Sequence, residues 1–113
     1  MINNNCSIGY AACDRLAAAQ ASVFVGLMRE ALAIAVDESN DVDVREAALL
    51  DLEDHAGDID NARDLMSLGG FPPIVALMAS EAPALQAAAA WVVGSAVKNH
   101  HELQLHLLTL PTT

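Results

Sequence analysis

Residues 58–99, DIDNARDLMSLGGFPPIVALMASEAPALQAAAAWVVGSAVKN, carry the clearest structural pattern in this chain. Three helical patterns follow one another within this stretch, at residues 59–68, from 72 to about 79, and from 83 to about 98. Gly69-Gly70 separates the first pattern from the second, and glycine adopts the positive φ at which many helices end. The stretch therefore predicts a short helix, a sharp stop, a second short helix and a long third helix.

The boundaries of these helices have chemical causes. Asp58 or Asp60 can accept hydrogen bonds from the free N–H groups at the start of the first helix. Proline at a first helical turn costs no hydrogen bond, because the N–H that it lacks has no partner there, and this suits helix starts at Pro72 and Pro83. Ser80 is the expected N-cap of the third helix. The unit of about 42 residues matches the period of armadillo-type repeats, about 40–47 residues.

The rest of the chain supplies partial neighbours of this unit. Residues 14–36 carry apolar side chains near helical spacing, Asp43 is expected to cap a helix that ends near His55, and residues 100–108 predict another helix. No alternation typical of strands persists anywhere. The side chains expected to face inward are Leu16, Val23, Leu27, Leu32 and Ile34, then Ala47, Ala48, Leu50 and Leu52, then Ala62, Leu65, Met66, Leu68, Ile74, Val75, Leu77 and Met78, and finally Leu85, Ala89, Val92 and Ala96.

These patterns predict an all-α fold, an armadillo-like α-solenoid of about two repeats. Residues 1–13, with three consecutive asparagines and no clear period, are expected to form a poorly ordered lead. Residues 14–110 are expected to form the helical repeat domain, with residues 58–99 as its best-formed repeat. Repeat arrays normally end in a polar cap. Because residues 103–113, LQLHLLTLPTT, offer no such cap, we expect the array to be cut short.

Composition and charge narrow the possible partners. The chain has 113 residues, a formal net charge of −10 and only five basic residues, which are scattered. Nucleic acid is therefore not expected as a partner, because phosphate binding needs clustered Lys and Arg. Cys6 and Cys13 form no CxxC motif and are expected to be reduced thiols of a cytoplasmic protein. The first residues lack the basic region of a secretory signal, and the apolar run 82–97 is too short for a membrane span.

The polar side chains show no catalytic or metal-binding pattern. His101 or Glu102 can share a helical face with His106, but a zinc site of the HExxH type needs a further ligand and a general base. Asp60 and Asp64 lie one turn apart at a helix start, where the helix dipole explains their charge. No Ser-His-Asp order, phosphate-binding glycine loop or GxSxG motif occurs. We therefore expect neither enzyme activity nor a metal, a cofactor or a small-molecule substrate.

Trp91 is the only tryptophan, and it lies on the long third helix of the unit. Trp91, Ser95, Lys98 and Asn99 follow helical spacing, so they can line one strip of that helix. Two interpretations stay open: Trp91 packs between neighbouring helices, or the strip faces the inside of a curved solenoid and binds a protein. Tryptophan is enriched among binding hot spots, and solenoids bind partners on their concave side. These four residues are therefore the candidate partner-binding site.

Four segments form a specific set: REAALLDLE (45–53), DIDNARDL (58–65), LGGFPPIVALM (68–78) and LQAAAAWVVGSAVKN (85–99). Together they resemble the armadillo-type nucleotide exchange factors of the 70 kDa heat-shock chaperones, the Hsp70-binding-protein family. The resemblance covers roughly residues 28–101. Generic armadillo repeats often carry asparagine four residues after the tryptophan, whereas this chain has Ser95 there, preceded by Gly94. This difference favours the exchange-factor branch.

The resemblance implies a co-chaperone that clasps a lobe of the chaperone's ATPase domain and promotes ADP release. It implies partner contacts through the third-helix strip of Trp91, Ser95, Lys98 and Asn99, without covalent chemistry. Members of the family usually have several repeats, so a chain with one well-formed unit is expected to be a truncated member. The alternative is an armadillo-type adaptor that binds another protein or peptide.

Overall fold

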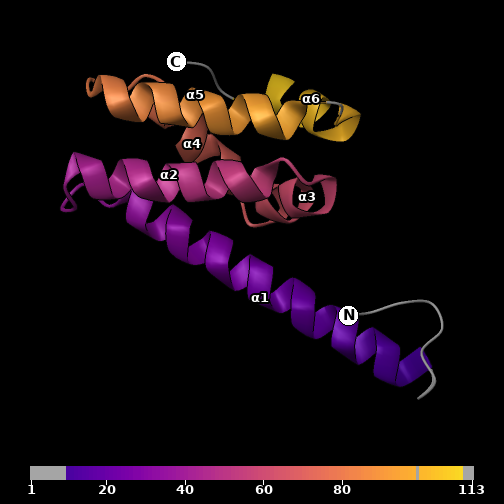
Figure 1. Ribbon diagram of the computed structural model, residues 1–113. Helices are drawn as coiled ribbons and strands as arrows, with labels where there is room; N and C mark the ends of the chain where they lie inside the picture. Colours follow the sequence, from indigo (N-terminus) through magenta and orange to yellow (C-terminus); the bar gives the residue numbers. More distant parts are fainter. Residues whose placement is uncertain (1–9, 99, 111–113) are drawn as a thin grey trace.

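The computed structural model describes residues 10–98 and 100–110, with side chains from Val23 onward. These residues form six α-helices and no strand (Figure 1). The all-α, armadillo-like fold expected from the sequence is confirmed. The helices are α1 (Tyr10–Val36), α2 (Val42–Ala56), α3 (Ile59–Ser67), α4 (Phe71–Leu77), α5 (Pro83–Val97) and α6 (His101–Leu108).

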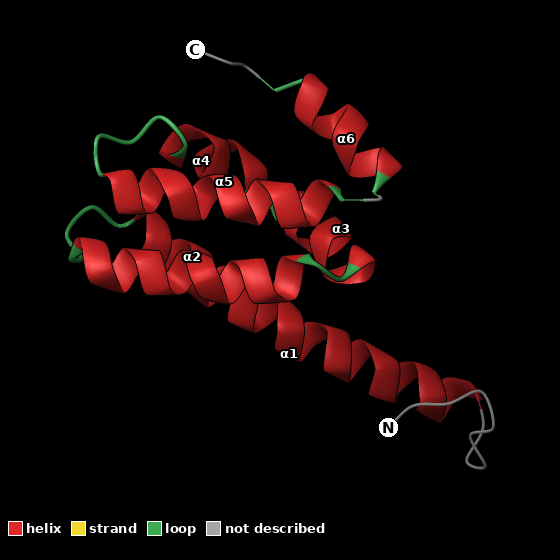
Figure 2. Cartoon of the chain, turned by 45° about the horizontal axis from the view of Figure 1, so that its top comes forward, coloured by secondary structure: helices red, strands yellow, loops and turns green. Residues whose placement is uncertain are grey.

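Helices α2 and α5 lie side by side, run in the same direction and form the largest helix–helix contact of the fold (Figure 1). Helix α1 packs diagonally against the other side of α2, and α4 packs against α5. The turned view in Figure 2 shows α3 near the ends of α2 and α5, with α6 continuing beyond α5. The predicted repeat thus corresponds to α3, α4 and α5, stacked on a layer made by α1 and α2.

The core lies between these two layers and is built largely from small side chains. Alanine supplies about half of the buried apolar residues. Such small side chains let the helix axes approach closely, so the ridges of one helix pack directly into the grooves of its neighbour. The buried apolar residues are Met28, Ala31, Ala35, Ala48, Leu49, Leu52, Ala56, Ala62, Leu65, Phe71, Ile74, Leu85, Ala88, Ala89, Val92, Ala96 and Leu103.

Several predicted helix boundaries are confirmed. The Asp58 carboxylate caps α3, because it accepts hydrogen bonds from the backbone N–H groups of Asp60 (2.9 Å) and Asn61 (3.1 Å). Gly69 adopts φ = 72°, the left-handed conformation that glycine permits without strain after a helix. Pro83 occupies the first turn of α5, where its missing N–H costs nothing.

Other boundaries differ from the prediction. Helix α1 begins at Tyr10 rather than Asp14, and the first nine residues of the expected lead lie outside the described residues. Asp41 is the N-cap residue of α2, because it is the last residue with extended backbone, and this places Asp43 within the first turn. Ser80 is also not an N-cap. Its Oγ accepts a hydrogen bond from the N–H of Ala82 (3.1 Å), and Ala82 itself precedes α5.

The predicted inward face is right for α5 but wrong for much of α1. Leu85, Ala89, Val92 and Ala96 are all buried. On α1, however, Val23, Leu27 and Ile34 are exposed, whereas Met28, Ala31 and Ala35 face the core. On α2, Ala48 and Leu52 are buried as expected, but Ala47 and Leu50 are exposed. The cause is that apolar side chains occur on several sides of α1 and α2, so helical spacing alone does not select the buried side.

Candidate partner-binding surface

Helix α5 presents Trp91 to solvent. The buried residues Leu85, Ala89, Val92 and Ala96 fix one side of this helix against its neighbours. Trp91 points away from that side, and 58% of its surface is exposed. Trp91 therefore does not pack between the helices that the structure describes. An exposed tryptophan on a rigid, well-anchored helix provides a large apolar contact for a partner.

A hydrogen bond across the helix pair fixes the register of α2 against α5. The hydroxyl of Ser95 donates to Oε2 of Glu53 at 2.8 Å, and the two residues are 42 positions apart. This separation equals the repeat length of about 42 residues expected from the sequence. Since both side chains are half-buried, the bond also holds the Glu53 carboxylate on this face.

A shallow hollow lies beside this hydrogen bond, where α2 and α5 end. Its volume is about 410 Å³, and its walls combine polar and apolar groups. Lys98 places a cation at this hollow together with the carboxylates of Glu53 and Asp54. The hollow can therefore offer both charge signs and an apolar patch to a protein surface. Its lining residues are Glu53, Asp54, Gly57, Ile59, Ser95 and Lys98.

The structure brings together three of the four predicted site residues. Ser95 and Lys98 line the same hollow, and Trp91 lies one helical turn before Ser95 on α5. Asn99 lies outside the described residues. We call Trp91, Ser95 and Lys98, together with Glu53 from α2, the α2–α5 face.

Sequence reasoning missed the part of this face that α2 and α3 contribute. Glu53, Asp54 and Gly57 come from the end of α2 and the turn after it, and Ile59 comes from the start of α3. Only Glu53 could have been predicted from the sequence, because it lies one expected repeat length before Ser95. The others depend on how the two layers stack.

The ion pairs found among the described residues both involve Arg63. Arg63 on α3 forms ion pairs with Asp60 (3.3 Å) and with Glu102 on α6 (3.0 Å). The hydrogen bond and charge of Glu102 raise the pKa of Arg63 above its ordinary value. Among the described residues, no group of three or more His, Cys, Asp or Glu side chains is placed to hold a metal ion. The Arg63–Glu102 ion pair joins α3 to α6.

His100 is the one buried polar side chain among the residues that the structure describes. Its Nδ1 accepts a hydrogen bond from the backbone N–H of Leu103 at 3.2 Å, so the imidazole caps α6. The helix start thus accounts for Nδ1, whereas Nε2 is buried without a hydrogen-bond partner among the described residues. Within residues 10–98 and 100–110, none of the helices combines the length and apolar character that crossing a membrane requires.

Comparison with known proteins supports the resemblance described above. The sequence model of the family described as "Nucleotide exchange factor Fes1" matches residues 11–65. The protein named "Hsp70 nucleotide exchange factor FES1" of Mycosarcoma maydis is 35% identical over 82 residues, which are 73% of this chain and 21% of that protein. The protein of the same name from Cryptococcus neoformans is 36% identical over 77 residues, 68% of this chain and 20% of that protein.

A second group of relatives carries a related name. "Nucleotide exchange factor SIL1" of Rattus norvegicus is 33% identical over 70 residues, 62% of this chain and 15% of that protein. No solved structure matches the chain significantly. The chain thus spans about a fifth of the length of the first curated relatives that it matches.

Proposed function

We propose that the chain belongs to the family of Fes1-type nucleotide exchange factors and that it is a co-chaperone that binds the ATPase domain of an Hsp70 chaperone and promotes ADP release. The proposed activity is not enzymatic. The protein changes the affinity of its partner for a nucleotide and forms or breaks no covalent bond. The cytoplasmic location expected from the sequence is part of this proposal, and cell fractionation would test it.

One observation carries the proposal, namely the exposure of Trp91 on a face that the sequence had singled out. The helix that holds Trp91 is anchored by five buried residues, so a partner meets the indole on a helix that is already in place. Preorganised aromatic anchors reduce the entropic cost of association. The Ser95–Glu53 bond and Lys98 add polar contacts around that anchor.

The proposed mechanism is differential binding. A factor that binds the open nucleotide-binding domain more tightly than the closed, ADP-bound one shifts the equilibrium toward the open form. The shift cannot exceed the difference in binding free energy between the two states, so a tenfold gain in the open population requires about 1.4 kcal/mol. The rigid pairing of α2 and α5 suits this task, because a stiff surface resists adapting to both states equally.

The first test measures release of fluorescent ADP from a purified Hsp70 ATPase domain by stopped flow, with and without the full chain. We expect faster release that saturates with added protein. If the chain binds without changing the release rate, the exchange activity is refuted and the adaptor alternative is favoured. If it neither binds nor accelerates release, the proposed partner is wrong.

A pair of variants tests the surface. Trp91→Ala should weaken binding of the ATPase domain by about 2 kcal/mol, or about 30-fold, as expected for a hot-spot tryptophan. It should leave the free energy of unfolding within about 0.5 kcal/mol of wild type, because the side chain is exposed. Leu108→Ala is the matched control, since Leu108 is exposed on α6, away from Trp91. Equal effects of the two substitutions on binding would exclude the α2–α5 face as the contact.

A further inference from the structure

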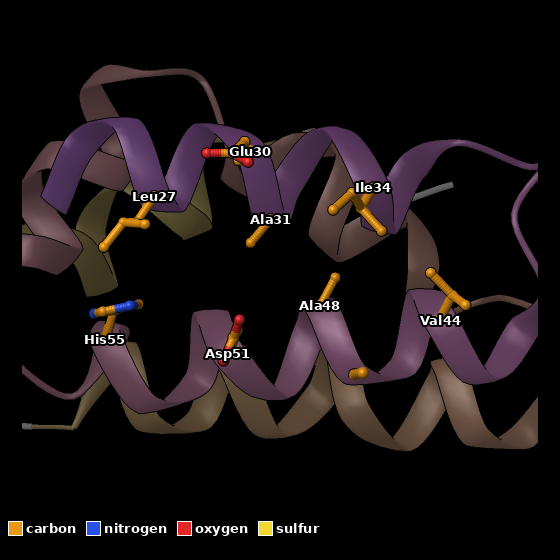
Figure 3. Close-up of a pocket in the computed structure, with 9 residues that line it drawn as sticks. Leu27, Glu30, Ala31, Ile34, Val44, Ala48, Asp51 and His55 are labelled. Atoms are coloured by element: carbon orange, nitrogen blue, oxygen red, sulfur yellow. The ribbon is translucent and has the colours of Figure 1, made fainter. Parts of the chain in front are cut away.

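A second hollow lies between α1 and α2. It has a volume of about 570 Å³, and Figure 3 shows side chains from both helices bordering it. Its floor is made of alanines, and its borders carry larger side chains, with Leu27 opposite His55 at one end and Ile34 near Val44 at the other. We call this hollow the α1–α2 trough; its lining residues are Leu27, Glu30, Ala31, Ile34, Val44, Ala47, Ala48, Asp51 and His55.

The border of the trough is apolar and accessible. Leu27, Ile34 and Val44 expose 46%, 38% and 48% of their surfaces. Phe24, one turn before Leu27, extends this border, and its ring meets the edge of the His55 ring at a centroid distance of 5.9 Å. Single exposed apolar side chains are common on folded proteins, whereas a cluster of large ones indicates an interaction site.

The charges at the trough have one sign. Glu30 on α1 and Asp51 on α2 line it, and no Lys or Arg does. Neither carboxylate takes part in the ion pairs found among the described residues, which both involve Arg63. Arg45 does not compensate them, because its Nε donates to the backbone oxygen of Ala35 at 2.9 Å. The trough therefore combines apolar borders with two carboxylates that form no ion pair among the described residues.

We propose that the α1–α2 trough binds a basic amphipathic helix of a partner protein, with its apolar side chains in the trough and its Lys or Arg side chains at Glu30 and Asp51. Charge selects this occupant. A second copy of the chain would bring a net charge of −10 to an acidic site. Residues 1–9 of the chain itself, MINNNCSIG, contain no Lys or Arg.

The dimensions of the trough fit a helix of two to three turns. Leu27 and Ile34 are seven residues apart on α1, about 10 Å along its axis. Apolar side chains at positions i, i+4 and i+7 of a bound helix span the same length. The floor made by the buried Ala31 and Ala48 lets another helix axis approach to roughly the usual 8–10 Å.

The α1–α2 trough is separate from the α2–α5 face. Successive residues of an α-helix are rotated by about 100°. Val44, at the border of the trough, and Glu53, which bonds Ser95, are nine residues apart on α2 and so point in roughly opposite directions. A basic helix in the trough therefore leaves Trp91 accessible. The proposal does not rest on the exchange activity, and both surfaces can be occupied together.

The probe for this site is a synthetic amphipathic peptide of about 16 residues, long enough to form a helix on binding. It carries leucine at i, i+4, i+7 and i+11 and lysine on the remaining faces. One control peptide has the same composition, with its leucines spread over all faces, and another has glutamate in place of lysine. Fluorescence anisotropy with the full chain at near-physiological salt measures each affinity. Only the first peptide should bind in the micromolar range, roughly.

Charge-reversal variants locate the binding site. Asp51→Lys should weaken binding of the basic amphipathic peptide by about fivefold, because it replaces a favourable charge pair with a repulsive one. Glu81→Lys changes the net charge equally, but Glu81 lies in the exposed turn before α5. It should alter the affinity by less than about twofold, as expected for a screened distant charge. Equal losses in the two variants would overturn the proposal, since attraction would then depend on net charge alone.

A shape variant tests the trough without changing charge. Ala47→Trp places a bulky indole at the exposed edge of the trough and should abolish binding of the peptide, whereas Ala33→Trp, at an exposed position of α1 outside the trough lining, should not. Circular dichroism confirms that each variant remains folded. If the peptide binds the Ala47→Trp variant as tightly as wild type, or if the wild-type chain does not bind it at all, the trough is not the proposed docking site.

Discussion

Replacement of Gly70 by alanine should destabilise the protein by about 2 kcal/mol, because the new methyl group meets a side chain that cannot move away. An ideal Cβ at Gly70 would lie 2.5 Å from Cδ1 and 3.1 Å from the carbonyl oxygen of Leu65. The N–H of Gly70 donates to that same oxygen at 3.0 Å, which fixes the two backbones at close range. Leu65 is fully buried, so its methyl groups can turn only into occupied space.

Two other glycines separate this packing effect from backbone effects. Gly57→Ala should leave stability unchanged or raise it by up to about 1 kcal/mol, because a Cβ there meets nothing within 4 Å and φ is −68°. Gly69 also has open space, but its φ of +72° should make Gly69→Ala cost roughly 1–2 kcal/mol. Gly69→Asn should recover part of that loss, because asparagine tolerates the left-handed conformation.

Urea unfolding followed by far-UV circular dichroism measures these differences. For an m-value near 2 kcal/mol/M, roughly, Gly70→Ala should lower the midpoint by about 1 M. In the Leu65→Ala background the same substitution should cost clearly less, because the contact that it disturbs has been removed. If Gly70→Ala unfolds at the same urea concentration as Gly57→Ala, the steric reasoning is refuted.

Three further predictions concern helix ends and one titrating group. His100→Ala should destabilise the protein by about 1 kcal/mol in thermal unfolding, because Leu103 loses its cap, whereas His100→Asn should retain most of the stability; equal losses would contradict the capping role. Asp58→Ala should cost about the same in urea unfolding, and an unchanged midpoint would exclude its capping bonds as a source of stability. Hydrogen bonds from Ser39 lower the pKa of Asp37 below its ordinary 3.8, so the stability that they confer is present above pH 3.8 and is lost as the pH falls through the lowered value. An NMR titration should place the Asp37 midpoint below 3.8, and Ser39→Ala should move it back up; identical midpoints in both proteins would contradict this cause.

The sequence predicted the helix boundaries best where a single residue imposes a backbone geometry. Gly69 permits a positive φ, Pro83 suits a first turn, and the Asp58 carboxylate satisfies free N–H groups. These effects act over a few residues and do not depend on the remaining fold. Where two aspartates lie near one helix start, as Asp41 and Asp43 do at α2, the sequence alone predicted the wrong N-cap residue.

The buried side of α1 was predicted wrongly because it depends on tertiary packing. Leu27 and Ile34 are at least as apolar as Ala31 and Ala35, and helical spacing favours either pair. The small pair faces the core, since α1 crosses α2 there at close range. The large pair is left at the border of the trough. An apolar pattern thus identifies a helix, but it does not say which stripe packs and which one remains accessible.

The candidate site was predicted in part for a related reason. Trp91, Ser95 and Lys98 share one helix, so their spacing places them on one strip without further information. Glu53 and Ile59 join the site only when α2 and α3 pack beside α5. The exposure of Trp91 also depends on packing, and the sequence had left it open between a buried and an accessible position.

The separation of 42 residues between Glu53 and Ser95 indicates how the protein can be lengthened by whole repeats. A further copy of residues 58–99 would present Ser95 where Glu53 now stands, so a Ser95→Glu substitution in each copy that precedes another would be needed to keep the hydrogen bond at every junction. Each inserted copy would lengthen the surface by one helix spacing, roughly 10 Å. The number of repeats then sets the width of the partner surface that such a protein can contact.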